Sequence, residues 1–386
     1  MNYNPANNSS SGKVKLIMSL LLFVFFSNGY GQVTVNPEKP FIDTTDGAFD
    51  VSYYLYNLHG FLPIVTPITE PAVGYGAAVA GLFFVPKKEK PGKYFQMPDV
   101  IGIGAGYTQN GTWLLGGGYF GFWKNDHIRY RGAGGYGHVN LKYYGRGDGF
   151  LDGNPAEFTI NAWGFIQQAT FRIAESRFML GGNYIFAKTK VTLFEDSKLP
   201  FIDPHDFELT NSGISLIAEY ENLDNIFSPS SGSRINVTYN QYLEFLGSDR
   251  NFGRFTTFAY YYLPVIKYRW TAGFRLDYQM AVDNPPFYAY PFIILRGVPA
   301  MRYQGKYLVV GETEQTVNLT RRWSVVAFAG YGQTFFDRIT GKTAWNTGGG
   351  FRYLIARSMG LRMGIDVARG PEEWAVYMVF GNAWLR

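Results

Sequence analysis

The sequence of 386 residues contains no cysteine, and its charged fraction is only 17%. Without cysteine no disulfide can stabilise the fold, and the lack of it fits export to a compartment where an unpaired thiol is a liability. Soluble globular domains carry about 25% charged residues, so the composition is unusual for a soluble enzyme. The formal net charge of +5 is scattered along the chain. Since there is no basic stripe, we expect no nucleic acid as a partner.

Motifs that carry chemistry are also missing. The histidines His59, His127, His138 and His205 have no spacing typical of a metal site. Residues 132–137 match G-x-G-x-x-G, but they lie inside an alternating strand pattern and open no helix, so they do not predict a dinucleotide site. No G-x-S-x-G elbow occurs. We therefore predict no enzyme, no metal and no cofactor, and keep an outer-membrane lipid hydrolase as a less favoured alternative.

Long hydrophobic runs are absent from most of the chain. One apolar run, residues 16–26, follows Lys13 and Lys15 and precedes the small residue Gly31. This pattern predicts a signal peptide over residues 1–31, since a membrane helix, the alternative, needs about 20 apolar residues. Beyond this run no stretch has the length of a membrane anchor. Only a closed barrel of strands could then hold the protein in a bilayer.

Glycine and aromatic residues are abundant, with 46 glycines and an aromatic fraction of 18%. They accompany a strict alternation of polar and apolar residues, as in the segment from Thr271 to Met280. There Arg275 and Asp277 fall on the polar face. An arginine facing lipid near the middle of a membrane costs about 2–4 kcal/mol, so the polar face indicates the lumen of a barrel. A soluble β-sandwich would also alternate, but it does not need so many long strands.

Turn residues divide the chain into sixteen predicted strands. An even number places both ends of a bacterial single-chain barrel on the periplasmic side, where turns are short and external loops are longer. The predicted strands are 61–68, 73–85, 98–109, 111–122, 127–144, 157–172, 177–193, 210–221, 233–245, 253–264, 268–281, 306–319, 323–335, 345–356, 359–368 and 374–385. The long predicted external loops are 145–155, 195–209 and 282–305.

The predicted fold is therefore all-β. We expect a 16-stranded antiparallel transmembrane β-barrel over residues 61–386, in the bacterial outer membrane, and a short periplasmic lead over residues 32–60. Pro63 and Pro67 suit only an edge strand, because proline donates no backbone hydrogen bond. The first strand is thus predicted to lie at a seam.

One predicted strand offers space on its lumen side for another backbone. Phe328, Gly330 and Gly332 share one face of a strand, and two glycines in phase leave a notch that another backbone can approach. The neighbouring strand presents Glu312 and Glu314 to the lumen. A loop arginine entering the lumen needs such a carboxylate partner, whereas a solvated loop arginine would need none.

The loop carries the motif that suggests a family. Leu295-Arg296-Gly297-Val298 resembles the V/I-R-G-F/Y tip of the sixth external loop in the BamA/TamA superfamily, also called bacterial surface antigen barrels. Phe328-Ala329-Gly330-Tyr331-Gly332 resembles the F-x-G/D-x-G motif that receives this tip. The chain departs from the pattern at Leu295 and Val298, and also after Glu314, where Thr316 replaces a common arginine. The resemblance implies that this sixth external loop folds back into the lumen, and our hypothesis is that Arg296 at its tip then contacts Glu314.

Further segments resemble the same superfamily in the same order. Asp224, Pro229 and Gly232 are similar to its D…P-x-x-G turn, and residues 63–76 look like its first hairpin. The resemblance implies a role in outer-membrane protein assembly or translocation, with outer-membrane lipids and an unfolded membrane-protein client as partners. We expect the chain to lack the superfamily's POTRA repeats, so that a separate periplasmic partner protein would capture the client. A passive pore or a structural outer-membrane protein is the alternative.

Overall fold

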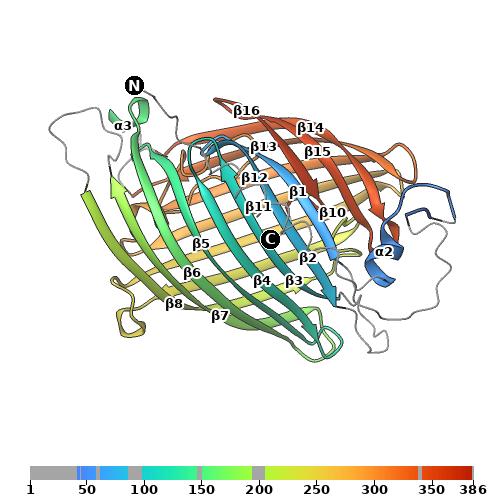
Figure 1. Ribbon diagram of the computed structural model, residues 1–386, viewed down its shortest axis with the longest axis horizontal. Coiled ribbons are helices and arrows are strands. Elements are labelled where there is room, and N and C mark those ends of the chain that lie inside the picture. The colour runs from blue at the N-terminus through green and yellow to red at the C-terminus, as the bar shows by residue number, and fades with distance from the viewer. Residues whose placement is uncertain are drawn as a thin grey trace, which may run out of the picture. The chain divides into compact units, whose positions relative to one another are not determined.

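The computed structural model shows a single sheet of sixteen antiparallel strands (Figure 1). It describes residues 41–43, 45–57, 61–85, 98–145, 150–193, 205–337 and 341–384. The strands are β1 (Phe61–Glu70), β2 (Gly74–Val85), β3 (Asp99–Thr108), β4 (Trp113–Trp123), β5 (Ile128–Tyr143), β6 (Ala156–Arg172), β7 (Phe178–Leu193), β8 (His205–Glu221), β9 (Gly232–Tyr242), β10 (Phe252–Ile266), β11 (Trp270–Val282), β12 (Tyr307–Asn318), β13 (Trp323–Phe335), β14 (Thr343–Ala356), β15 (Leu361–Arg369) and β16 (Trp374–Phe380).

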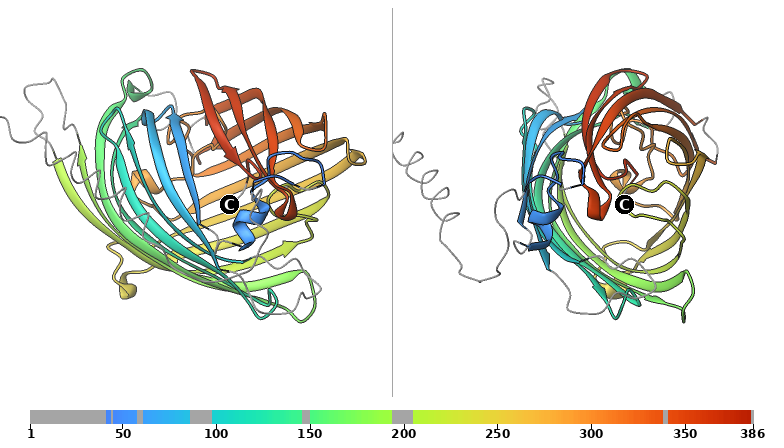
Figure 2. Two further views of the ribbon diagram at one scale, coloured as in Figure 1. Left: turned by 45° about the vertical axis from the view of Figure 1, so that its right-hand side comes forward. Right: turned by 90° about the vertical axis from the view of Figure 1, so that its right-hand side faces the viewer.

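The prediction of a sixteen-stranded antiparallel barrel is confirmed. Each strand pairs with the next along the chain, and the sheet curls into the ring seen end-on in Figure 2. Short connections such as 124–127, 267–269 and 357–360 lie at one end, and the long segment 283–306 lies at the other. Because outer-membrane barrels have short periplasmic turns, the end with the short connections is the periplasmic end.

The ring closes at a seam between β1 and β16. The sheet order begins at β1 and ends at β16, so no ladder of backbone hydrogen bonds joins these two strands in the described part of the chain. Instead, the hydroxyl of Thr69 accepts a hydrogen bond from the backbone N–H of Val376 at 3.0 Å and donates one to the carbonyl of the same residue. The side chain of Thr69 thus bonds β16 where other strand pairs have a ladder of backbone hydrogen bonds.

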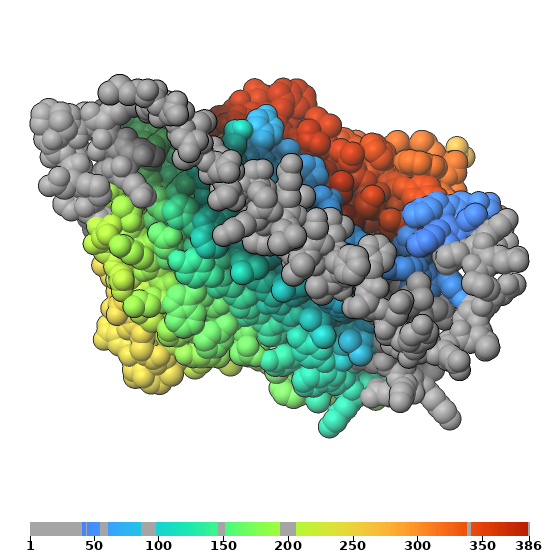
Figure 3. All heavy atoms as spheres, in the orientation of Figure 1, coloured from blue at the N-terminus to red at the C-terminus, as the bar shows by residue number. Residues whose placement is uncertain are grey.

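Alternation along the strands separates an apolar outer face from a charged lumen. On β11, Phe274 and Leu276 are exposed on the outside, whereas Arg275 and Asp277 are buried. The outer face of β3 to β6, whose atoms are teal and green in Figure 3, also carries exposed apolar side chains. Its exposed apolar side chains include Ile101, Ile103, Leu115, Tyr136, Trp163 and Phe165. Such a band suits lipid, since soluble proteins rarely expose apolar patches of this extent.

Two predicted strand boundaries were wrong, the start of β8 and the end of β16. β8 begins at His205 instead of 210, which shortens the predicted loop 195–209. β16 ends at Phe380 instead of 385, because Gly381 adopts a left-handed φ of 72° and turns the chain out of the sheet. A sequence pattern cannot reveal this turn, since Trp384 would also suit the end of a membrane strand.

The lead before β1 is described from residue 41 and ends in helix α2 (Ser52–Asn57). Val51 packs with Phe84 of β2 and with Met359, in the short helix η3 (Arg357–Met359) between β14 and β15. The lead therefore contacts strands on both sides of the seam at the periplasmic end. The predicted signal peptide lies outside the described residues. None of the described helices is long and apolar enough to cross a membrane.

Candidate functional site in the barrel lumen

The long segment 283–306 between β11 and β12 forms an apolar cluster with the barrel wall. Its backbone folds on itself, because the N–H of Ile293 bonds the carbonyl of Tyr303 at 3.0 Å. Below its tip, apolar side chains from the segment pack against β12 and β14. The cluster consists of Ile293, Leu295, Val298, Tyr303, Leu308, Val310 and Ala344, all of which are buried.

Arg296 at the tip of this segment lies among three carboxylates. Its guanidinium is 2.9 Å from Glu312 and 2.8 Å from Glu314, both on β12, and 2.7 Å from Asp366 on β15. Its side chain is 11% exposed. The guanidinium carbon also lies 3.4 Å from the centre of the Phe328 ring, a cation–π contact worth about 2 kcal/mol where it is desolvated. The structure therefore brings together the predicted residues Arg296, Glu312, Glu314 and Phe328.

The same network holds charged residues that the sequence did not single out as partners. Asp366 also binds Arg352 of β14 at 2.9 Å, and Glu312 binds Arg275 of β11 at 3.0 Å. Arg275 further donates to the carbonyl of Ile294 at 3.0 Å, so the barrel wall holds the segment backbone as well as its tip. The inward position of Asp366 on β15 is visible in the alternation. Which inward charges meet depends on the register between strands and on the path of the segment.

The two glycines of β13 leave space for the segment. A Cβ at Gly332 would lie 2.9 Å from a methyl carbon of Ile293, and a Cβ at Gly330 would lie 2.9 Å from Leu295. Both distances are shorter than van der Waals contact, so larger residues would displace the segment. Gly297 at the tip has a φ of +80°, and its Cβ would meet the backbone nitrogen of Gly370 at 2.9 Å. Glycine suits this position on both counts.

The tip contacts both strands of the seam. The N–H of Gly297 donates to the hydroxyl of Tyr377 on β16 at 2.8 Å, and the N–H of Ala300 donates to Glu70 on β1 at 3.2 Å. Tyr377 and Glu70 bond each other at 3.4 Å. These contacts lie near the external end of the seam, one residue along each strand from the Thr69 contact with Val376.

The predicted turn residues lie elsewhere, in the link between β8 and β9. Asp224 accepts hydrogen bonds from the backbone N–H groups of Ser230 at 2.9 Å and Ser231 at 3.1 Å, which closes the turn. Gly232 has a φ of +103°, and its Cβ would clash with the carbonyl of Asn222 at 1.9 Å. Pro229 lines a pocket at the periplasmic end of the lumen. These residues do not touch the loop tip.

The residues after β16 turn into the lumen, which sequence reasoning missed. Trp384 is buried, and its indole N–H donates to Glu312 at 2.7 Å. The ring packs beside Tyr260 and Tyr262 of β10, with ring centres 5.7 Å and 5.8 Å away. The available signal was a terminal tryptophan preceded by Gly381, a residue that favours a turn. Glu312 thus joins the loop tip, the barrel wall and the C-terminal tail.

A second charged cluster lies on the opposite wall near the periplasmic end. Arg129 of β5 binds Asp126 at 2.7 Å and Glu221 of β8 at 2.9 Å, and Arg234 of β9 binds Glu219 at 3.2 Å. All five side chains are largely buried. Each of these five charges has a partner within the cluster.

Two of the four histidines, His127 and His138, have structural partners. His127 bonds the carbonyl of Lys124 and Glu175, and His138 bonds Asn161 at 2.8 Å. Asp152, in the external loop after β5, binds Arg302, and hydrogen bonds from Lys342 and Arg302 lower its pKa. Among the described residues, no group of three or more histidine, aspartate or glutamate side chains could hold a metal ion.

An antiparallel barrel of sixteen strands with an apolar outer face and a charged lumen is an outer-membrane β-barrel. Residues 139–290 match the Omp85 superfamily domain. This match, which covers less than half of the chain, and the sixteen-stranded fold confirm the resemblance to the BamA/TamA superfamily, and the chain is a β-barrel of the bacterial outer membrane. The matched stretch includes Asp224, Pro229 and Gly232 and ends before Arg296.

Solved structures show the same fold. BamA from Haemophilus ducreyi lacking POTRA domains 1–3 superposes with a TM-score of 0.55 at 11% identity, covering 99% of this chain and 80% of that chain. CdiB from Escherichia coli gives a TM-score of 0.55 at 11% identity, covering 82% and 61%. CdiB from Acinetobacter baumannii gives 0.53 at 10% identity, covering 83% and 59%. At these identities the likeness shows the fold alone. No curated protein sequence matches the chain.

Proposed function

We propose that this barrel inserts or translocates polypeptide at the outer membrane, with a separate periplasmic partner that delivers the client. The observation that carries the proposal is the seam, where the loop tip contacts β1 through Glu70 and β16 through Tyr377. The Omp85 match and the fold shared with BamA and CdiB support it. In this role Arg296 anchors the tip, and the tip holds the seam closed.

The seam is the line along which the barrel would open at lowest cost. Elsewhere two strands share a continuous ladder, as in the twelve residue pairs between β12 and β13. At the seam, the described polar contacts are those of Thr69 with Val376 and of Glu70 with Tyr377. A hydrogen bond contributes about 1 kcal/mol net. Parting β1 from β16 therefore breaks far fewer bonds than parting any neighbouring pair, and it exposes two strand edges to which a client strand could pair.

The experiment is to lock the seam. The chain has no cysteine, so the double variant Thr69→Cys with Val376→Cys can be joined by a short reducible cross-linker at one place only. Purified protein in liposomes is mixed with an unfolded outer-membrane barrel protein, and client folding is followed by its heat-modifiable mobility on gels. We expect the unlocked barrel to accelerate client folding, cross-linking to abolish the acceleration, and reduction to restore it.

The control is a cysteine pair placed on two neighbouring strands that share a continuous ladder of backbone hydrogen bonds. Val309 on β12 and Gln333 on β13 are direct partners in the sheet, so Val309→Cys with Gln333→Cys places the same cross-link on the outer wall away from the seam. This link should leave the acceleration unchanged. Equal client folding with the seam locked and unlocked would contradict the proposed function, as would a barrel that accelerates nothing.

A passive pore is the alternative that liposomes also test. The segment 283–306 and the tail with Trp384 both enter the lumen, so efflux of small solutes from liposomes should be low for the intact protein. We further propose that residues 1–31 form a cleaved signal peptide, that residues 32–60 are a periplasmic lead, and that the chain is not an enzyme. Mass spectrometry of the protein from outer membranes checks the first boundary.

A further inference from the structure

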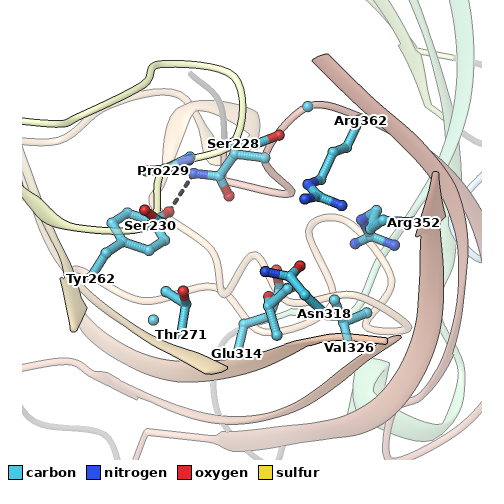
Figure 4. A pocket seen from close by; sticks show the side chains of 14 residues that line it. Ser228, Pro229, Ser230, Tyr262, Thr271, Glu314, Asn318, Val326, Arg352 and Arg362 are labelled. Atoms are coloured by element: carbon cyan, nitrogen blue, oxygen red, sulfur yellow. Dashed lines mark hydrogen bonds between the residues drawn. The ribbon is translucent and has the colours of Figure 1, made fainter. Parts of the chain in front are cut away.

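A polar pocket lies at the periplasmic end of the lumen, next to the contacts that Arg296 makes with the wall, because Glu314 belongs to both. It has a volume of about 80 Å³. Such a space holds several water molecules, and therefore a carboxylate or a phosphate group. Its lining comes from the strands β10 to β15, the link between β8 and β9, and the residues after β16. The side chains that matter to the argument are Ser228, Ser230, Asn318, Arg352 and Arg362 (Figure 4).

The pocket has an excess of positive charge on one side. Arg352 and Arg362 lie next to each other there, facing Tyr262 and Ser230 across the space (Figure 4). Arg352 is balanced by Asp366 at 2.9 Å. Arg362 donates to the hydroxyl of Ser324, and among the described residues no carboxylate forms an ion pair with it. An arginine has five N–H donors, so most of those on Arg362 remain available to a ligand.

The carboxylate in the pocket lining does not balance Arg362. Glu314 is bound by Arg296 at 2.8 Å, on the side of the network that holds the loop tip. Since Asp366 balances Arg352, Arg362 is the positive charge in this cavity that has no counter-ion, and a guanidinium fork matches the oxygens of a carboxylate or phosphate. The charge distribution thus selects for a negatively charged ligand.

A second, independent observation points to the same ligand. The hydroxyl oxygen of Ser228 is buried and has no hydrogen-bond partner, and Ser228 lines this pocket. A buried hydroxyl without a partner costs about 1–3 kcal/mol. It can donate to an oxyanion held by Arg362, as can the second N–H of the Asn318 amide, whose first N–H donates to the carbonyl of Tyr268.

We propose that this pocket binds an oxyanion, a carboxylate or phosphate group that enters from the periplasmic side. Ser228 and Ser230 belong to the link between β8 and β9, and Asn382 follows β16, so the mouth of the pocket is made of periplasmic segments. Arg362 holds the charge, and Ser228 fixes the orientation by hydrogen bonding. This proposal rests on the contacts within the pocket and does not depend on whether the barrel inserts proteins.

The test is calorimetric titration of the purified full barrel in detergent, at low chloride, with inorganic phosphate and separately with acetate. We expect at least one of them to bind. Arg362→Gln should lower the affinity about tenfold or more, because a hydrogen bond to a charged group contributes about 1.5–3 kcal/mol. Ser228→Ala should lower it less. Tighter binding of phosphate assigns the site to phosphate-bearing ligands, and tighter binding of acetate assigns it to carboxylates.

Arg369→Gln is the matched control, because Arg369 is on the same strand and lies over the outward ring of Trp374 at 5.8 Å. It should bind as the unchanged protein does. If Arg362→Gln fails to fold, Ser228→Ala alone decides, since its hydroxyl makes no bond within the protein. The site would be refuted if neither anion bound at millimolar concentration, or if binding were unchanged in both pocket variants. A loss of affinity in Arg369→Gln equal to that in Arg362→Gln would also refute it.

Discussion

At the scale of single residues, the charged side chains in the lumen compensate one another as a group. Arg296 is bound by Glu312, Glu314 and Asp366, and each of these carboxylates lies in a wall strand. A buried ion pair contributes little net stability compared with apolar packing, but removing one partner leaves the others without compensation. The cost of losing Arg296 is therefore larger than the strength of any one of its contacts.

Arg296→Ala should destabilise the barrel by about 3–5 kcal/mol, because three buried carboxylates lose their shared cation. The measurement is the urea concentration at which the folded band disappears from unheated gels. Arg321→Ala, which removes an exposed arginine from a periplasmic turn, is the control and should shift the midpoint little. An unchanged midpoint for Arg296→Ala would show that the tip does not hold the fold.

Gly332→Ala should also destabilise the barrel, by about 1–3 kcal/mol, because the added carbon would lie 2.9 Å from Ile293 and push the segment out of its notch. Gly311 on the adjacent strand β12 has open space around an added Cβ. Gly311→Ala is thus the matched substitution, expected to be close to neutral in the same urea titration. Equal effects at both positions would mean that the notch is not filled by the segment.

At the scale of elements, two segments outside the sheet hold the periplasmic end. The lead binds Arg322, in the turn between β12 and β13, through Asp43, Asp46 and Asp50. The tail inserts Trp384 between β10 and β12. Neither segment could be assigned to a place from the sequence, because short polar leads and single tryptophans carry no periodicity.

The lead should detach in acid. Hydrogen bonds from Thr45 and Arg357 lower the pKa of Asp43, and the hydrogen bond from Arg322 lowers that of Asp46. Groups with a lowered pKa stabilise the bound state above their unfolded pKa of about 3.9, and this stabilisation is lost as the pH falls through the lowered value. Limited proteolysis by pepsin should therefore cut the lead faster as the pH drops below about 4.

The double variant Asp43→Asn with Asp46→Asn is the control for the acid effect. It should make the lead susceptible to an ordinary protease at neutral pH, while the barrel remains intact. Protection of the lead that is independent of pH, and that survives the double substitution, would mean that the ion pairs with Arg322 do not hold it.

Trp384→Ala should cost about 3–5 kcal/mol, because a buried ring is lost from its contacts with Tyr260 and Tyr262. Trp374→Ala is its control, since this tryptophan is 64% exposed at the start of β16. Thermal unfolding followed by tryptophan fluorescence measures both. A tail that only rests in the lumen would give the two variants similar midpoints.

At the scale of the whole molecule, the barrel is an inside-out arrangement, with apolar side chains exposed and charged side chains enclosed. Leu276→Arg places a charge at the middle of β11 on the outer face, where Leu276 is 56% exposed. In lipid this should cost about 2–4 kcal/mol. Tyr268→Arg, in the periplasmic turn, should cost about 1 kcal/mol or less. Folding titrations into lipid vesicles compare them, and similar costs would place β11 outside the membrane.

The residue pattern was enough to predict the barrel. Alternation with period two separates lipid-facing from lumen-facing residues, and glycine, proline and polar turns mark the strand ends, so the fold and most strand bounds follow from local chemistry. The folded molecule was needed to find which inward charges meet, that Trp384 leaves the sheet for the lumen, and that Arg362 shares a pocket with Ser228. These contacts join residues that are far apart in the chain. They depend on the register between strands and on the path of the loops, and both arise from packing that no local sequence pattern encodes.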